Sequence, residues 1–396
     1  MKKLILLTFI LMSGLSMAQG ELSDKAEISL ITCGPNPDEL YSAFGHTALR
    51  VHDPIQGIDL VFNYGIFDFD QPNFYLNFAR GNLLYMLAVN RWVDFLRIYR
   101  NEGRFVREQQ LNLSQAQKEA YWLFLKQNAR PENRDYYYDY FYDNCATRVR
   151  DGLETALGMG VVQFKEKSYY QPSLSIRELC DIYLQEQAWG DFAIDFCLGL
   201  PMDKKADSRI EMFLPDLLAE AFANATVLRD GNPIPLVKSD VLLLKQEVKG
   251  EASWLSPLLF WALFLVLGVV LTMFNYEKPR TIAWFDILWS GLLGLLGFFL
   301  LGLWLLTNHK AAAWNFNLLL FNPLWLMISW SLLRGKWSKF SELLLKYSPY
   351  LMAILLGSWI WLPQELHLSL MPLTALIILR TWHLTYKGQN AKKPLQ

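Results

Sequence analysis

The sequence is poor in the residues from which metal sites and disulfide frameworks are built. Its 396 residues include only four cysteines and five histidines. Ahead of the apolar C-terminal part, only His46 and His52 occur, and their spacing with the cysteines matches no zinc site. The sequence also contains no glycine-rich phosphate-binding loop, internal repeat or low-complexity tract. We therefore expect no metal and no cofactor.

Charge is scarce as well, and it is nearly balanced. Charged residues make up 19% of the chain and the net charge is −1. This balance argues by itself neither for nor against nucleic acid, and we expect no nucleic-acid partner. Hydrophobic residues, at 53%, are concentrated at the N-terminus and after about residue 254. That distribution indicates a membrane protein.

Residues 1–18 have the form of a secretory signal peptide. Two lysines precede an apolar run that is too short to span a bilayer, and Ser16-Met17-Ala18 is a small-x-small cleavage site. An uncleaved N-terminal anchor is the alternative. No cysteine follows the cleavage site, so the chain is not itself a lipoprotein. The part after Ala18 is expected to be exported.

The C-terminal part, residues 251–386, is expected to be a transmembrane domain of five helices. Each segment is apolar and has Trp or Tyr near its ends, as membrane-spanning helices do, although the last two are short. The expected spans are Trp254–Phe274, Ile282–Leu306, Phe316–Leu333, Tyr347–Leu362 and Leu368–Leu384.

Basic residues predict the orientation of these spans. They gather in the first and third loops and in the tail, residues 387–396, whereas the second and fourth loops hold only Lys310. By the positive-inside rule the basic loops and the tail are cytoplasmic. Residues 19–250 then lie in the periplasm, anchored to the inner membrane.

Residues 19–250 are long enough for one compact domain, and their pattern predicts an α+β fold. We expect residues 161–250 to be mainly helical, with a terminal hairpin at Arg229–Pro235. The expected strands are residues 27–33, 45–53, 59–67, 82–89 and 104–113, and the expected helices are residues 94–100, 115–128 after Ser114, and the helix that begins at Cys145 after Asn144.

Cys145 is the first candidate for chemistry. Its side chain shares a helix face with Val149, Leu153 and Ala156, but it stands at the tip of that helix. Unpaired N–H groups and the positive end of the helix dipole favour a thiolate there. The alternative is that Cys145 is a small buried hydrophobic residue, which is what most free cysteines are.

A thiolate nucleophile requires an imidazole beside it, and His46 is the candidate. It lies on an expected strand after Gly45, where a glycine lets another backbone or a substrate come close. The alternative is a hydrogen-bonded core histidine. His52 is about 20 Å farther along the strand and is expected at the surface. Asn63 is the first choice for the residue that orients His46, and Asp59 is the second.

These residues resemble a known family. The order "GH" on an early strand and "NC" at a later helix is similar to that of circularly permuted papain-like proteins, such as permuted NlpC/P60 enzymes and the lecithin:retinol acyltransferase group. More closely, "SAFGHTALRV", "NYGIFDF", "GNLLYMLAV", "YDNCATRVRD" and "FLPDLL" resemble the exported domain of Lnb-type lipoprotein N-acyltransferases. The loop "NHKAAAWNFNLLLFNP", residues 308–323, resembles their membrane domain.

The resemblance implies a thiol-dependent acyltransferase. Cys145 would take an acyl chain from a phospholipid, with His46 as general base and Asn63 as its partner, and the α-amine of a diacylglyceryl-cysteine lipoprotein would accept it. Arg50, Asn144, His309 and Asn315 are the candidates for substrate binding.

Two other classes of protein remain open. One is a membrane-anchored hydrolase with the same Cys–His pair, either an envelope amidase or a phospholipase. The other is a non-catalytic membrane scaffold in which Cys145 is packed. The exported compartment also permits disulfides, so Cys180 and Cys197 are a possible pair.

The predicted topology has a direct test. A reporter that is active only in the periplasm, fused after Lys387, should be inactive because the tail is expected in the cytoplasm. The same reporter fused within residues 19–250 should be active. Activity at the tail would mean an even number of spans.

Overall fold

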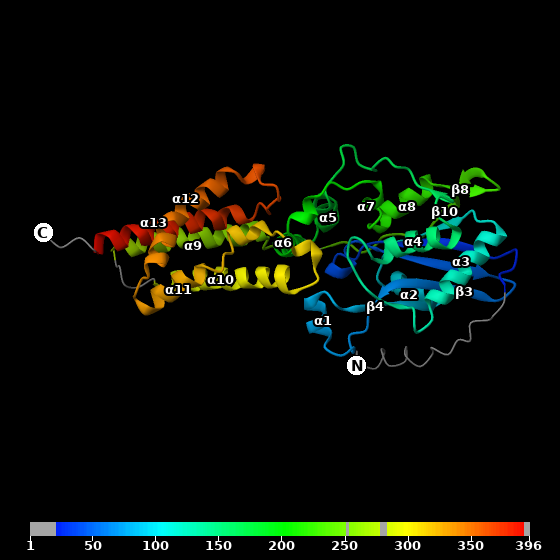
Figure 1. Ribbon diagram of the computed structural model, residues 1–396, viewed down its shortest axis with the longest axis horizontal. Helices are drawn as coiled ribbons and strands as arrows, with labels where there is room; N and C mark the ends of the chain where they lie inside the picture. Colours follow the sequence, from blue (N-terminus) through cyan, green and yellow to red (C-terminus); the bar gives the residue numbers. More distant parts are fainter. Residues whose placement is uncertain (1–20, 251–252, 278–282, 392–396) are drawn as a thin grey trace.

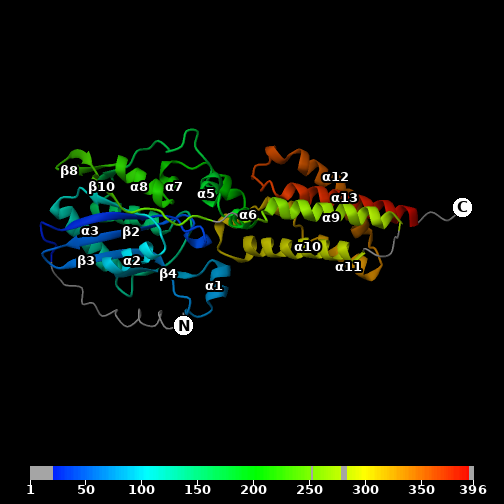
Figure 2. The ribbon, with the colours of Figure 1, turned by 180° about the vertical axis from the view of Figure 1, so that it is seen from behind.

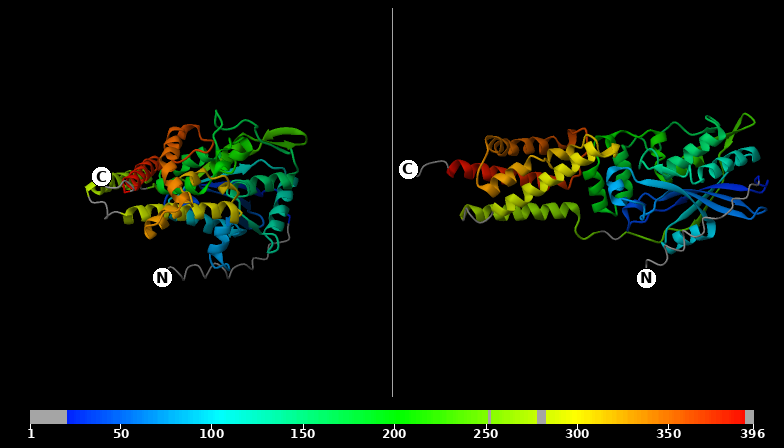
Figure 3. Two further views of the ribbon diagram at one scale, coloured as in Figure 1. Left: turned by 60° about the vertical axis from the view of Figure 1, so that its left-hand side comes forward. Right: turned by 60° about the horizontal axis from the view of Figure 1, so that its bottom comes forward.

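The computed structural model describes residues 21–250, 253–277 and 283–391, so the expected signal peptide lies outside the described residues. The chain forms a sheet-containing N-terminal part and a C-terminal bundle of long helices, which lie end to end (Figures 1 and 2). The view from below in Figure 3 shows the same arrangement. The mixed architecture that the sequence predicts is therefore confirmed.

The N-terminal part is built on a seven-stranded sheet of order β10-β5-β1-β2-β3-β4-β6, in which every neighbouring pair is antiparallel. The five strands expected from the alternating apolar pattern are all present. The strands are β1 (Glu27–Cys33), β2 (His46–Asp53), β3 (Ile58–Ile66), β4 (Leu84–Arg91), β5 (Val106–Leu111), β6 (Asp135–Tyr137) and β10 (Val237–Leu244).

Helices cover both faces of this sheet, which is why six of the seven residues of β1 are buried. One face packs against α3 (Gln115–Asn128), α4 (Cys145–Leu157) and α8 (Pro215–Asn224). The other face packs against α2 (Trp92–Asn101). Ser114 and Asn144 cap α3 and α4 as expected, each with a capping box.

Residues 161–250 contain four α-helices among loops and short strands, and they also return to the sheet. The hairpin of β8 (Thr226–Arg229) and β9 (Asn232–Pro235) is present, and Asp230 and Gly231 at its turn have positive φ. After it, β10 joins β5 at the edge of the main sheet, which the sequence did not reveal. The other elements are β7 (Val162–Gln163), α5 (Ile176–Leu184), α6 (Ala188–Cys197), η2 (Leu40–Ser42), η3 (Leu200–Asp203) and α7 (Ser208–Glu211).

The connection between β3 and β4 contains an unexpected short helix, α1 (Phe74–Arg80). It buries none of its own residues. Figure 1 shows it below the junction of the two parts, beside the end of α10.

The C-terminal bundle differs from the expected spans at its third element. Among the described residues, two segments are long and apolar enough to cross a membrane, Pro257–Phe274 and Trp284–Leu306. The expected span Phe316–Leu333 is not one helix, because its first half forms a 3-10 turn and a loop. The remaining 10-residue helix α11 is about 15 Å long, half of a hydrocarbon core. A count of five spans therefore stays a prediction. The elements are α9 (Pro257–Glu277), α10 (Ala283–Leu306), η4 (Lys310–Ala312), η5 (Phe316–Leu319), α11 (Trp325–Arg334), α12 (Lys339–Gly357), η6 (Trp359–Trp361) and α13 (Leu370–Ala391).

The loop that precedes α11 packs directly onto α10. Gly297 makes this possible, because a Cβ there would lie 2.2 Å from the carbonyl oxygen of Phe321. Backbone atoms of loop and helix are therefore in contact where a larger residue would separate them.

A buried ion pair joins three helices of the bundle. Arg380 of α13 is fully buried and forms two hydrogen bonds of 2.8 and 2.6 Å with Asp286 of α10. Arg380 also donates to Thr272 of α9 at 2.6 Å, and the Trp289 indole donates to Asp286. Each charge thus has its partner and further hydrogen bonds inside the apolar bundle, as buried charges require.

Polar groups of loop 308–323 join the bundle to the periplasmic part. The side-chain amides of Asn315 and Asn317 donate at 2.8 Å to the carbonyls of Phe196 and Asp195, at the last turn of α6. Gly199 lies so close that a Cβ there would be 2.1 Å from the carbonyl oxygen of Ala313. The loop therefore caps the C-terminus of α6, and the two parts share one hydrogen-bonded joint.

We predict that breaking the Arg380–Asp286 pair destabilises the bundle. Arg380→Met alone leaves Asp286 buried without its cation, at a cost of about 3–5 kcal/mol in unfolding free energy. The double variant Arg380→Met with Asp286→Leu should recover much of this loss, because neither charge remains. Thermal unfolding of the purified protein in detergent measures both. A double variant less stable than Arg380→Met would contradict this interpretation.

Candidate active site

Cys145 is the first residue of α4, and the side chain of Asn144 fixes the chain there. The Asn144 Oδ1 accepts hydrogen bonds of 2.9 Å from the backbone N–H groups of Ala146 and Thr147. Its Nδ2 donates to the carbonyls of Tyr140 and Phe213. The thiol of Cys145, which is 7% exposed, is thereby held at the positive end of the helix.

The structure brings Cys145, His46 and Asn63 together. His46 is the first residue of β2, and its Nε2 lies 2.5 Å from Oδ1 of Asn63 on β3. Because an amide oxygen only accepts, Nε2 carries the proton and Nδ1 is left for Cys145. The imidazole and the Cys145 side chain are near enough for each to shift the pKa of the other. The set has the order of partners that a thiol–imidazole–amide triad requires.

A local separation of β2 and β3 makes room for the tip of α4. The ladder between these strands ends at Leu49 and Phe62, and β3 is irregular between Asn63 and Ile66. Within that irregular stretch Gly65 has φ +88°, and a Cβ there would lie 3.6 Å from Cβ of Cys145. The glycine thus allows the strand to pass close to the cysteine.

Burial and charge act in opposite directions on the two titrating groups. Burial raises the pKa of the Cys145 thiol. The charge of His46, the interaction with its imidazole and a backbone N–H of Thr47 lower it by more, so the net effect is a lowered thiol pKa. Burial lowers the pKa of His46, but the Cys145 charge and the bonds to Cys145 and Asn63 leave it raised. The site therefore favours a thiolate–imidazolium pair.

Tyr138 is a further residue of the site that the sequence did not single out. Its hydroxyl is near enough to the Cys145 thiol to help lower the pKa of that thiol, and its ring stacks on Tyr85 with centroids 4.3 Å apart. Tyr138 lies in the aromatic run Tyr136–Tyr142 before Cys145, but a run with six aromatic residues does not show which of them points inward.

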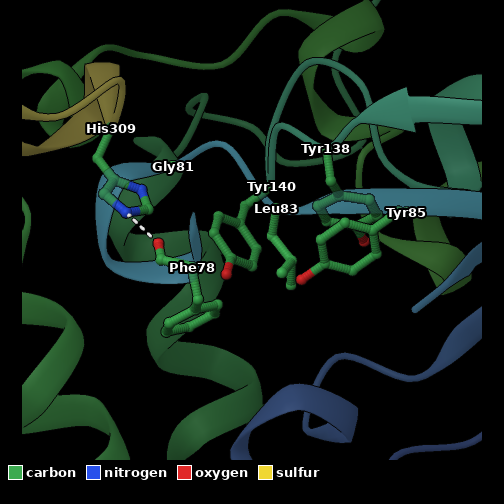
Figure 4. Close-up of a pocket in the computed structure, with 7 residues that line it drawn as sticks. All are labelled: Phe78, Gly81, Leu83, Tyr85, Tyr138, Tyr140 and His309. Atoms are coloured by element: carbon green, nitrogen blue, oxygen red, sulfur yellow. Dashed lines mark hydrogen bonds between the residues drawn. The ribbon is translucent and has the colours of Figure 1, made fainter. Parts of the chain in front are cut away.

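A small cavity of about 10 Å³ lies beside Tyr138, on the side toward His309. Figure 4 shows its lining side chains extending from Tyr138 and Tyr85, past Tyr140 and Phe78, to His309 of the membrane part. The cavity therefore lies between the Cys145 site and the end of α10.

The remaining candidates have other partners. Arg50 forms ion pairs with Asp59 at 2.7 Å and Glu108 at 3.2 Å, and its guanidinium lies over the Trp92 ring. Asp59, the second choice for orienting His46, is therefore bound to Arg50. The structure places neither residue beside Cys145.

Asn144, His309 and Asn315 also hold structural positions. Asn144 uses its amide to cap α4, and Asn315 uses its amide to cap α6. His309 Nε2 is hydrogen-bonded to the Phe78 carbonyl at 3.1 Å, at the far end of the cavity. Of the three, only His309 lines the cavity.

The other cysteines are not equivalent to Cys145. All four thiols are free, so Cys180 and Cys197 are not paired. Burial raises the pKa of Cys33 and of Cys180, and it raises that of Cys197 to about 11. Cys145 alone among them has a lowered pKa.

One group of carboxylates among the described residues is close enough to hold a metal ion: Asp181, Asp191 and Asp195. Arg177, fully buried, already lies 2.5 Å from Asp195. Burial and the neighbouring carboxylates raise the pKa of Asp181 to about 8. A proton on Asp181 and the Arg177 guanidinium thus offset two of the three carboxylate charges in this group, which joins α5 and α6, and His367 lies 3.4 Å from the third, Asp191.

The fold and the site define a class of protein: a periplasmic sheet domain with a Cys–His–Asn set, attached to a transmembrane helical domain. Residues 22–180 match the Lnb N-terminal periplasmic domain, and residues 249–391 match the Lnb transmembrane domain. The chain therefore belongs to the Lnb-type family. A search of curated proteins and a search of solved structures each found no significant match.

We predict that Cys145 is alkylated selectively and at unusually low pH. The lowered pKa of the Cys145 thiol leaves the thiolate populated below the ordinary thiol pKa of 9.0. Iodoacetamide should therefore modify Cys145 near pH 7, as measured by peptide mass spectrometry, while Cys33, Cys180 and Cys197 stay unmodified.

The His46→Ala variant is the test of the cause. Without the imidazole, burial is the largest influence on the pKa of the Cys145 thiol. The pH at which the alkylation rate is half-maximal should therefore rise by at least about one unit. Asn63→Ala should shift it less, because it removes only the orienting bond. An unchanged midpoint in His46→Ala would show that His46 does not set the reactivity of Cys145.

Proposed function

We propose that this protein is a lipoprotein N-acyltransferase that works through an acyl thioester on Cys145. The observation that supports this function best is the Cys145–His46–Asn63 set, hydrogen-bonded as a nucleophile, base and orienting amide. Membership of the Lnb-type family and the attached transmembrane domain support a substrate that resides in the membrane. We also propose that the sheet domain is a circularly permuted papain-like fold, since the strand histidine precedes the helix cysteine.

The first half-reaction transfers an acyl chain to the enzyme. The Cys145 thiolate attacks the ester carbonyl of a phospholipid, an S–C bond forms, and the C–O bond to glycerol breaks. The His46 imidazolium gives its proton to the departing glycerol oxygen. A lysophospholipid leaves, and Cys145 holds the acyl chain as a thioester.

Backbone N–H groups at the tip of α4 stabilise the oxyanion of this step. The first N–H groups of a helix have no partner within it, and that of Cys145 adjoins the reacting carbon. Asn144 engages the next two N–H groups and so fixes the direction of the first. In this proposal Asn144 positions the oxyanion donor without touching substrate.

The second half-reaction transfers the chain to an amine. The α-amine of a diacylglyceryl-cysteine lipoprotein attacks the thioester, an N–C bond forms and the S–C bond breaks. Neutral His46 accepts the amine proton, and the Cys145 thiolate is regenerated beside the imidazolium. Both substrates lie in the outer leaflet of the inner membrane, and the C-terminal tail lies in the cytoplasm.

The mass of a co-expressed lipoprotein's N-terminal peptide tests this function. We expect one additional fatty acyl group on its α-amine with the intact enzyme and none with Cys145→Ala. Cys197→Ser is the matched control and should leave the product unchanged. In the absence of acceptor, the Cys145 peptide should carry an acyl mass that neutral hydroxylamine removes.

Two outcomes would contradict the proposal. N-acylation that persists in Cys145→Ala would exclude the thioester. An acyl-Cys145 that transfers its chain only to water, with acceptor lipoprotein present, would identify a hydrolase instead.

A further inference from the structure

The β3–β4 connection, residues 67–81, exposes an unusual concentration of large apolar side chains. We call it the aromatic segment. Helix α1 lies within it and buries none of its own residues. The exposed fractions are 60% for Phe69, 83% for Tyr75, 48% for Leu76 and 46% for Phe78. An apolar patch of this kind on an exported domain indicates contact with a membrane or another apolar surface.

Hydrogen bonds hold the aromatic segment against the periplasmic end of a membrane helix. The backbone N–H of Asn308, two residues after α10, donates to the Arg80 carbonyl at 2.8 Å, and its side chain donates to Asn82 at 2.6 Å. His309 is bonded to the Phe78 carbonyl. Gly81 permits this close approach, because a Cβ at this position would lie 3.2 Å from the backbone nitrogen of His309. The segment is thus fixed at the level where α10 leaves the membrane.

Exposed tryptophans lie at the same end of the helical bundle. Trp254 precedes α9, Trp314 follows α10 and Trp361 lies between α12 and α13, with exposed fractions of 86, 62 and 75%. All three connections are at the end of the bundle that faces the sheet domain (Figure 2). Tryptophans gather at the boundary between lipid and water. Leu306, 80% exposed at the last turn of α10, continues the apolar surface toward α1.

We propose that the aromatic segment is inserted into the outer leaflet and admits the acyl chain of a phospholipid to Cys145. The occupant of its apolar surface is lipid, because that surface is continuous with the lipid-facing end of α10. Asp68 and Asp70 in the same segment limit the insertion to the interfacial layer, about 5–10 Å deep. The delivery part rests on the proposed function, whereas the insertion part does not.

The route from the leaflet to the thiol follows the cavity beside Tyr138. Phe78 and Tyr140, each 46% exposed, stand at its outer side, and Tyr138, whose hydroxyl helps to lower the pKa of Cys145, stands at its inner side. With a volume of about 10 Å³, the cavity is no larger than a water site. A chain therefore enters only when the Phe78 or Tyr140 ring swings aside. Both rings are exposed on the surface that this proposal places in the leaflet, so lipid contact and opening are coupled.

Photocrosslinking tests insertion without any use of activity. Benzoylphenylalanine replaces Tyr75 in one sample and Ile55 in another, in nanodiscs of phosphatidylethanolamine and phosphatidylglycerol. Ile55 is the matched control, since it is 71% exposed at the β2–β3 turn, on the strand ends opposite to His46. We expect phospholipid adducts at position 75 and none at position 55. Equal labelling at the two positions would overturn the insertion.

A pair of acidic substitutions tests delivery. Tyr75→Asp with Leu76→Asp should lower acylation of Cys145 from nanodisc phospholipid by about tenfold, because two side chains no longer partition into the interface. Acylation by a water-soluble short-chain p-nitrophenyl ester should be unchanged. Ile55→Asp with Leu242→Asp, both at exposed positions of the sheet domain, should leave both rates unchanged.

The outcomes separate this inference from the proposed function. A wild-type protein that acylates Cys145 from neither donor overturns the proposed function, while the crosslinking result still decides insertion. Equal loss with both donors in the Tyr75→Asp, Leu76→Asp variant overturns delivery, since the defect is then in the site itself. Retained acylation from phospholipid also overturns it.

Discussion

The side-chain amide of Asn144 is the interaction on which the site depends. Its oxygen accepts hydrogen bonds from two backbone N–H groups of α4. Its nitrogen donates to the carbonyl of Tyr140, in the aromatic loop before α4, and to the carbonyl of Phe213, just before α8. It thus joins three segments at the point where the thiol is placed. Because a helix end without such partners frays, a different residue here would loosen the position of Cys145 relative to His46.

A few polar side chains also join the sheet domain to the membrane domain. Asn315 and Asn317 close the end of α6, and Asn308 and His309 hold the aromatic segment. Loop 308–323 therefore contacts the sheet domain at two places, and Gln364 and Glu365 add further hydrogen bonds to Leu198 and Asp203. Such hydrogen bonds fix a direction as well as a distance, so the opening beside Tyr138 keeps one orientation toward the bilayer.

Much of the sheet was predictable because its strands have clear apolar patterns and its helices begin at strong caps. Strand β10 was not predictable, because most of its residues are exposed at the edge of the sheet. It also pairs with β5, which lies far earlier in the sequence, before the helices of residues 161–250. α1 has no buried face, so periodicity gives no signal. The third membrane segment was misjudged because hydropathy does not distinguish a spanning helix from a loop packed on α10.

The chemistry of the site was more accessible than its surroundings. That Cys145, His46 and Asn63 come together was predictable, because a thiol, an imidazole and an amide at a helix tip and on strands are what thiol catalysis would need. Asn144 and Asn315 were expected near substrate because a sequence does not show which polar groups a folded chain will bond. Tyr138 was hidden among similar residues for the converse reason: its orientation depends on Gly65 and the separation of two strands.

The ion pair between Asp286 and Arg380 has a consequence for biogenesis. The two residues are 94 positions apart, so α10 reaches the membrane well before its partner helix has been synthesised. Until then Asp286 stands in the apolar layer without a counter-charge, at an apparent insertion cost of about 2.5–3.5 kcal/mol. The many Leu and Phe residues of α10 outweigh this cost, so α10 can insert first and the ion pair forms once α13 arrives. A chain truncated before Arg380 would keep Asp286 without its counter-charge.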